Sequence, residues 1–117
     1  MIYVDRGILG LREEHTEFIL GAGEALLLQP GRVHEGVSDF DLELSFYWLH
    51  FEVATETDEV QALAVPQWSQ VKAPERFVAL LRLFLAEQED GAPATALELL
   101  VMALLERLAR SPLSSAN

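Results

Sequence analysis

The sequence predicts a mainly β protein with C-terminal helices: a sandwich or barrel of short strands, followed by two α-helices. Up to about residue 66, short apolar segments alternate with turns that are rich in Gly, Pro and charged residues, as is typical of all-β domains. From about residue 73 onward, apolar residues recur at helical spacing instead. We therefore divide the chain into a β segment, residues 1–66, and a helical segment, residues 67–117.

The longest expected strand, Leu42 to Val53, places alternate side chains on two faces. Phe46 and Trp48 share one face, and Tyr47 and Leu49 share the other. Because both faces carry large side chains, we expect both to be covered. Turns at Gly and Pro residues separate the strands that we expect over residues 2–4, 8–13, 16–20, 25–29, 34–37, 42–53 and 63–65.

Pro74 is suited to the first position of a helix, and Gly91-Ala92-Pro93 interrupts the apolar pattern that follows it. Thr95 and Glu98 have the spacing of a capping box at the start of a second helix. The second helix is apolar nearly all round, so it must bury more than one face. We expect a second subunit to cover it through residues at coiled-coil spacing: Leu97, Val101, Leu104 and Leu108.

Composition and charge narrow the class of protein. The chain has 117 residues, 50% of them apolar, and no cysteine, which indicates one domain without disulfides or a thiolate zinc site. Its net charge of −11 disfavours direct binding to nucleic acid or to an anionic membrane. It contains no apolar run long enough to cross a bilayer and no secretory signal. We expect a cytoplasmic protein.

Two stretches of the sequence resemble a known family. Residues 23–34, Gly-Glu-Ala-Leu-Leu-Leu-Gln-Pro-Gly-Arg-Val-His, are similar to the second motif of cupin barrels, with Gly23, Gly31 and His34 in register. Residues 46–51, Phe-Tyr-Trp-Leu-His-Phe, resemble a signature of the effector-binding domains of AraC-type transcription regulators. The likeness covers about residues 1–110.

The resemblance implies a cupin-like barrel, also called a double-stranded β-helix, followed by two α-helices. In the family, the barrel holds a small-molecule effector, often a sugar, and the helices pair two subunits. A separate C-terminal domain with helix-turn-helix motifs binds DNA. That domain and the family's first strand or arm are missing from this sequence, so we expect an effector, a homodimer, and contact with DNA only through the missing domain.

The resemblance also implies an effector site. In sugar-responsive relatives, a tryptophan at the position of Trp48 and an arginine at the position of Arg6 face the barrel lumen. An indole ring can stack on the C–H face of a sugar, whose hydroxyl groups need polar partners. The expected effector-binding residues are Arg6, His34, Phe46, Trp48 and His50.

Other interpretations of these residues stay open. Trp48 as a plain core residue is an equal alternative, because half of the chain is apolar. A second alternative is that Arg6 forms an ion pair with a carboxylate such as Asp5 or Glu24. A third reading of the whole domain is a dimerisation module whose barrel is filled by its own side chains.

The sequence predicts no metal, cofactor or catalytic residue. Metal-binding cupins supply His-x-His and a glutamate from their first motif and a histidine from their second, and only the last is matched, by His34. Acidic residues are expected on solvated turns and loops: Glu13, Glu14, Glu17, Glu56, Asp58 and Glu59. We therefore predict a non-enzymatic sensing domain. The alternative is a free-standing small cupin enzyme acting on a sugar or small acid.

Overall fold

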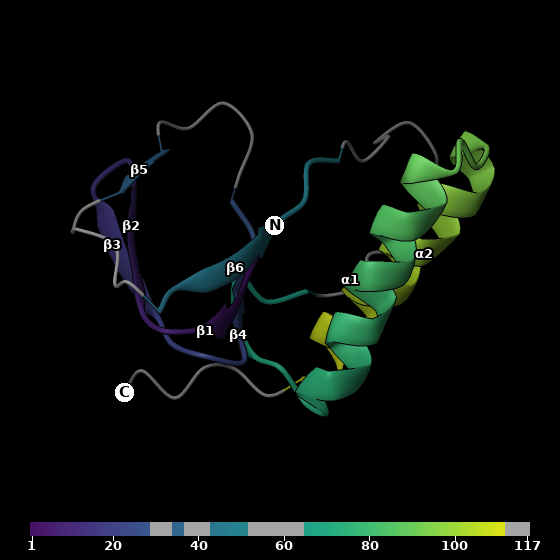
Figure 1. Cartoon of the computed structure of the whole chain (residues 1–117). Coiled ribbons are helices and arrows are strands. Elements are labelled where there is room, and N and C mark those ends of the chain that lie inside the picture. The colour runs from purple at the N-terminus through teal and green to yellow at the C-terminus, as the bar shows by residue number, and fades with distance from the viewer. Residues whose placement is uncertain (29–33, 37–42, 52–64, 112–117) are drawn as a thin grey trace.

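The computed structural model describes residues 1–28, 34–36, 43–51 and 65–111. Two antiparallel sheets and a pair of helices form three layers (Figure 1). The central sheet has the order β6 (Ser45–Trp48), β1 (Ile2–Arg6), β4 (Glu24–Leu26) and β7 (Trp68–Gln70). The outer sheet has the order β3 (Thr16–Leu20), β2 (Leu9–Glu13) and β5 (His34–Gly36). The predicted fold class, mainly β with two C-terminal helices, is confirmed.

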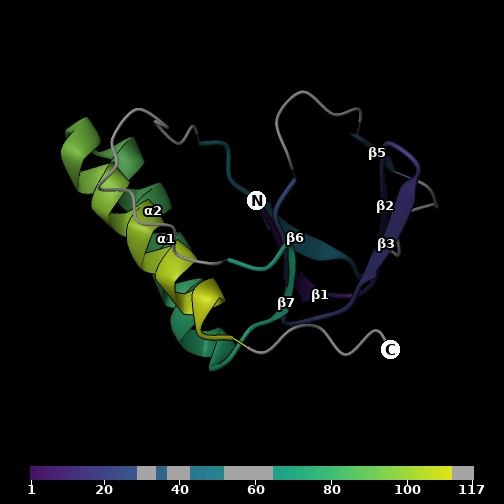
Figure 2. The ribbon, with the colours of Figure 1, turned by 180° about the vertical axis from the view of Figure 1, so that it is seen from behind.

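The helix pair consists of α1 (Pro74–Glu89) and α2 (Ala94–Ala109). It packs against the face of the central sheet that points away from the outer sheet, as the view from behind also shows (Figure 2). Pro74 begins α1, as predicted. The capping box is wrong, because α2 begins one residue before Thr95, with Pro93 as its N-cap and no side-chain cap. Among the described residues, neither helix has the length and apolar character needed to cross a membrane.

Alternation along β1 divides the apolar residues between two cores. Ile2 and Val4 point toward the outer sheet, whereas Tyr3 points toward the helices and contacts the ring of Phe77, 5.0 Å between centroids. Burial raises the pKa of Tyr3 to about 12, with a smaller contribution from Asp5. The core between the sheets consists of Ile2, Val4, Leu9, Leu11, Phe18, Leu20 and Leu26.

The core between the central sheet and the helices includes residues that we expected at a subunit interface. Leu104 and Leu108 are 0% and 1% exposed within the single chain, and Leu97 and Val101 pack against the same core. These four residues face inward because this side of α2 packs against α1 and the central sheet. A second subunit would have to pack on other side chains of α2, of which Leu99 and Met102 are the most exposed apolar ones.

The predicted strand bounds are confirmed for β3, β1 is longer than predicted, and β2, β4 and β6 are shorter, while one strand was missed. β4 ends at Leu26 and β6 comprises Ser45–Trp48, while Leu42 and Val53 lie outside the described residues. Of the strand expected at 63–65, only Val65 is described, and it is not in a strand. β7 instead follows at Trp68–Gln70, pairs with β4, and places a strand inside the segment that we expected to be helical.

Candidate functional site

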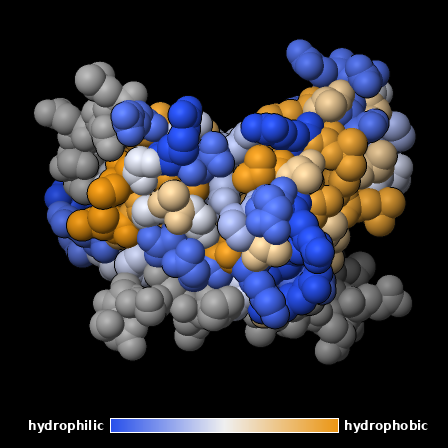
Figure 3. All heavy atoms as spheres, turned by 60° about the horizontal axis from the view of Figure 1, so that its bottom comes forward, coloured by the Kyte–Doolittle hydropathy of each residue, from blue (hydrophilic) through white to orange (hydrophobic). Residues whose placement is uncertain are grey.

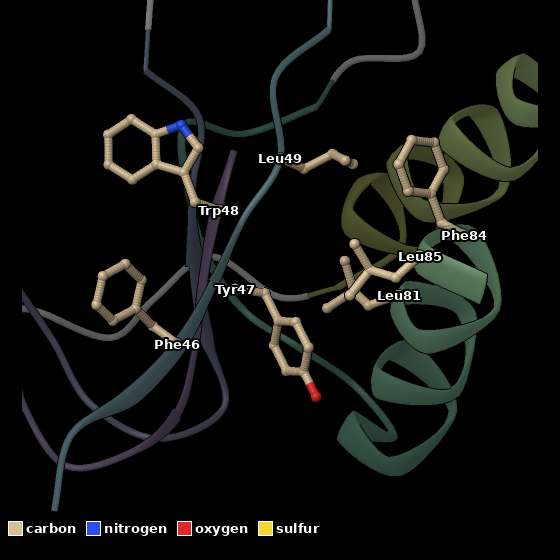
Figure 4. Close-up of a pocket in the computed structure, with 7 residues that line it drawn as sticks. All are labelled: Phe46, Tyr47, Trp48, Leu49, Leu81, Phe84 and Leu85. Carbon is tan, nitrogen blue, oxygen red and sulfur yellow. The ribbon is translucent and has the colours of Figure 1, made fainter. Parts of the chain in front are cut away.

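The two faces of β6 belong to different parts of the molecule. Phe46 and Trp48 lie opposite Val4 and Ile2 of β1, so they share the face of the core between the sheets. They extend from one side of the strand, while Tyr47 and Leu49 extend from the other, toward the helices (Figure 4). The expected alternation is confirmed.

Only the helix-facing side of β6 is well covered. Leu49 is 6% exposed, whereas Phe46 and Trp48 are 37% and 46% exposed. The expectation that both faces are covered is wrong for the described residues, because the core between the sheets closes over Ile2 and Val4 and does not extend across β6. An aromatic surface therefore remains open on the inner face of the sandwich.

His50 adds to this aromatic surface. Its imidazole lies parallel to the indole of Trp48, with 6.1 Å between ring centroids and 17° between ring planes. His50 is exposed and lies two residues after Trp48, the last residue of β6 that pairs with β1. The stacked pair offers a flat face and a ring nitrogen, which suits a ligand with both apolar and polar groups.

A polar cluster occupies the matching end of the outer sheet. Glu13, the last residue of β2, is only 2% exposed, and its carboxylate accepts a hydrogen bond from Nε2 of Gln67 at 2.8 Å. Nε2 of His34 lies 3.6 Å from the other carboxylate oxygen, an ion pair when the imidazole is protonated. β1 runs into the corner at Gly7 and β2 runs out of it, so Ile2 and Glu13 both lie at the end away from the corner. Trp48 pairs with Ile2 and therefore lies at the same end of the sandwich as this cluster.

The burial of Glu13 corrects our expectation that it lies on a solvated turn. The turn comprises Glu14 and His15, both exposed, and Glu13 is still part of the strand. Its side chain follows Leu9 and Leu11 on the inner face, since alternate residues of a strand share a face. That alternation was the signal in the sequence that could have placed Glu13 inside.

Arg6 is separated from the other expected site residues. It pairs with Ser45 at the far end of β1, after an irregularity in the register, roughly 13 Å along the strand from Ile2. Its side chain is exposed and forms no ion pair or hydrogen bond within the described ranges. Phe46, Trp48 and His50 thus belong to one aromatic surface, and His34 lies at the same end of the sandwich as Trp48. Arg6 lies at the opposite end of β1.

Glu24 does not serve as the partner that one interpretation gave to Arg6. One of its carboxylate oxygens accepts the backbone N–H of Gly21 at 2.7 Å, and the other accepts Nε1–H of Trp68 at 2.9 Å. The Trp68 ring also meets Phe18 of the outer sheet edge to face, with 5.8 Å between centroids. Glu24 therefore fixes the tryptophan that joins the two sheets.

Comparison with known proteins gives the family. The model of the AraC-like ligand binding domain matches residues 1–112. The chain belongs to the AraC-like ligand binding domain family. Its recognition from the motifs around His34 and Trp48 is confirmed. The match includes every strand and both helices of this AraC-like domain.

One similar protein is the uncharacterized HTH-type transcriptional regulator YisR of Bacillus subtilis (strain 168). It is 36% identical over 92 residues, which cover 78% of this chain and 31% of YisR. The AraC-like domain thus spans less than a third of the length of that relative. No solved structure matches the chain significantly.

The described part of the AraC-like domain holds no candidate metal centre. No three His, Asp or Glu side chains come together there in a way that could hold an ion. His34 lies beside the Glu13 carboxylate, which also accepts a hydrogen bond from the side-chain amide of Gln67. This arrangement is suited to hydrogen bonding with a polar ligand.

Proposed function

We propose that this chain is the effector-sensing domain of a transcription regulator, and that it binds a small polar organic molecule, such as a sugar, against the aromatic face of β6. The observation that carries the proposal is the exposure of Phe46 and Trp48 on the inner face of the sandwich. Large aromatic side chains are normally buried, and an exposed cluster of them is typical of ligand or partner sites.

Polar groups at the same end support a hydroxyl-bearing ligand. The Glu13 carboxylate is an acceptor, and the His34 ring offers a donor or an acceptor. Burying hydroxyl groups of a ligand without such partners would be costly. The chemistry therefore favours a compact molecule with an apolar face and several hydroxyl groups.

The position of β6 suggests how binding is reported. The strand carries the aromatic face on one side, and Tyr47 and Leu49 contact the helix layer on the other. A hollow of about 160 Å³, lined by residues 46–49 on one side, separates them from Leu81, Phe84 and Leu85 of α1 (Figure 4). A ligand that favours one position of β6 would shift the population of helix positions across this hollow.

We propose that the parts of the regulator that respond to effector binding lie outside this chain. A second subunit would pack on the helix layer, and a helix-turn-helix domain elsewhere in the regulator would bind DNA. YisR is named an HTH-type regulator, and the match covers only 31% of it. Both facts support a separation of effector binding from DNA binding.

A thermal-shift screen of sugars and small organic acids tests the effector site. A ligand of the folded state raises the melting temperature. Trp48→Ala should weaken its affinity about tenfold or more, as for loss of an aromatic anchor. Leu83→Ala is the matched control, because Leu83 is also 46% exposed but lies on α1.

Fluorescence locates the ligand independently of stability. The part of the tryptophan fluorescence that is lost in Trp48→Phe comes from the Trp48 indole. We expect the ligand to change the intensity of this part of the emission. A ligand that binds Trp48→Ala as tightly as the unchanged protein would refute the site. If no compound of the screen binds, the reading of a self-filled dimerisation module gains support over the sensing domain.

A further inference from the structure

Half of the basic residues of this acidic protein gather in one place. Lys72, Arg76, Arg107 and Arg110, four of the eight Lys and Arg residues, line a hollow of about 200 Å³. The hollow lies where the start of α1 meets the end of α2, at the lower end of the helix pair in Figure 1. Figure 3 brings that end forward and shows a hydrophilic surface there, beside hydrophobic side chains along the helices.

Few of these charges are compensated within the described ranges. Arg110 donates from Nε to the Glu106 carboxylate at 2.8 Å. Lys72, Arg76 and Arg107 form no ion pair with described residues. Three positive charges around one concave surface repel one another, and an anion would relieve that repulsion.

The helix termini explain only part of this cluster. Arg107 and Arg110 at the C-terminus of α2 interact favourably with the negative end of that helix dipole. Lys72 and Arg76 flank the N-terminus of α1, the positive end of a dipole, where cations are unfavourable. Their position there therefore points to an external negative charge.

Hydrogen bonds hold the start of α1 and the end of α2 together beside this hollow. Ala73, the N-cap, has a left-handed backbone conformation with φ of 53°, and no side chain accepts a hydrogen bond at this terminus. The backbone N–H of Lys72 donates to Oγ of Ser111 at 3.1 Å, and that hydroxyl donates to the carbonyl of Arg107 at 2.7 Å. These bonds fix the two helix ends against each other, so the hollow is preformed.

We propose that this hollow binds a small oxyanion of the phosphate type. The guanidinium groups of Arg76 and Arg107 donate to its oxygens in pairs, and Lys72 adds a point charge. The volume suits a small group rather than an extended polymer. The site is separate from the aromatic face of β6 and does not depend on the proposed effector.

Titration with inorganic phosphate, followed by amide NMR and by melting temperature, tests the site. Sodium chloride at equal ionic strength separates a specific ion from general screening. We expect phosphate to raise the melting temperature and to shift the signals of residues 72–76 and 107–111. Arg76→Gln and Arg107→Gln should each weaken binding about tenfold or more, the loss expected for a charge-assisted hydrogen bond.

Arg82→Gln is the matched control, since it removes the same charge from an exposed position of α1 outside the hollow. It should bind phosphate like the unchanged protein. Lys72→Gln, outside both helices, provides a second variant if either arginine variant fails to fold. Equal responses to phosphate and chloride, or unchanged binding by the hollow variants, would overturn the proposal. Shifts caused by a short DNA duplex but not by phosphate would overturn it in favour of a nucleic-acid surface.

Discussion

Gly7 is where the chain leaves the central sheet for the outer one, and its backbone has a φ of 84°. A Cβ atom at this position would lie 2.8 Å from the Cα of Leu44, closer than real contacts allow. Leu44 precedes β6 and packs against the core between the sheets. Gly7 therefore fixes the distance between the corner and the strand that carries the aromatic face.

Replacing Gly7 with alanine should destabilise the domain by roughly 2 kcal/mol or more, since both the left-handed conformation and the contact become unfavourable. Thermal or urea denaturation measures this. Gly36→Ala is the control, because a Cβ there meets nothing within 4 Å. It should change stability by less than about 0.5 kcal/mol. Equal effects of the two substitutions would contradict the role of Gly7.

Glu13 shows what a residue-by-residue reading of the sequence misses. Three acidic or titratable residues in a row, Glu13, Glu14 and His15, suggest a solvated turn, and two of the three are indeed exposed. Glu13, in contrast, continues the inner face of Leu9 and Leu11, and its carboxylate accepts a hydrogen bond from Gln67, which is 54 residues away. A partner so distant leaves no local signal, so alternation alone could have placed Glu13 inside.

At the scale of secondary structure, the helices were easier to predict than the strands. Helical periodicity repeats over sixteen residues in α1 and again in α2, so their existence is well determined. β7 has three residues, directly after a Pro and a Gln, and depends on pairing with β4. Such short strands are defined by their neighbours in the sheet, and one sequence does not show which segments become neighbours.

The outer face of α2 leads to a prediction about assembly. Leu99 and Met102 are 71% and 47% exposed and lie three residues apart on one helix face. We expect a homodimer through this face, and replacing both residues with glutamate should convert it to a monomer. Analytical ultracentrifugation at micromolar concentration measures the change.

Ile19→Glu is the control for that experiment. Ile19 is also exposed, at 63%, but belongs to the outer sheet, so this variant should remain dimeric. A monomer for the unchanged protein at these concentrations would rule out the proposed assembly. If the α2 variant remains a dimer, the subunits pair through another surface.

On the scale of the whole molecule, stability should depend on the ionisation of the chain's first residue. The amino group of Met1 donates to the carbonyl of Leu49 at 2.8 Å, and burial lowers its pKa from 8.0 to about 6. Between these values the unfolded chain binds more protons, so the free energy of unfolding increases with pH. This contribution is complete above pH 8 and is lost as the pH falls to about 6.

The expected effect, in a chain that starts at Met1, is on the order of 1 kcal/mol after allowance for solvent screening. An NMR titration of Met1 should have its midpoint near pH 6. Urea denaturation across the same pH range measures the free energy. A midpoint near 8 would show that the amino group is solvated, and the predicted pH dependence would then be absent.

The three-layer arrangement places two different demands on residues 46–49, the last three residues of β6 and the residue that follows them. Positions 46 and 48 serve the open aromatic face, and positions 47 and 49 serve the helix core. Substitutions at the first pair change one layer and leave the packing of the other intact. Descendants of such a scaffold can therefore acquire new ligand preferences by changing even-numbered positions, while the neighbouring odd-numbered positions preserve the helix layer from one lineage to the next.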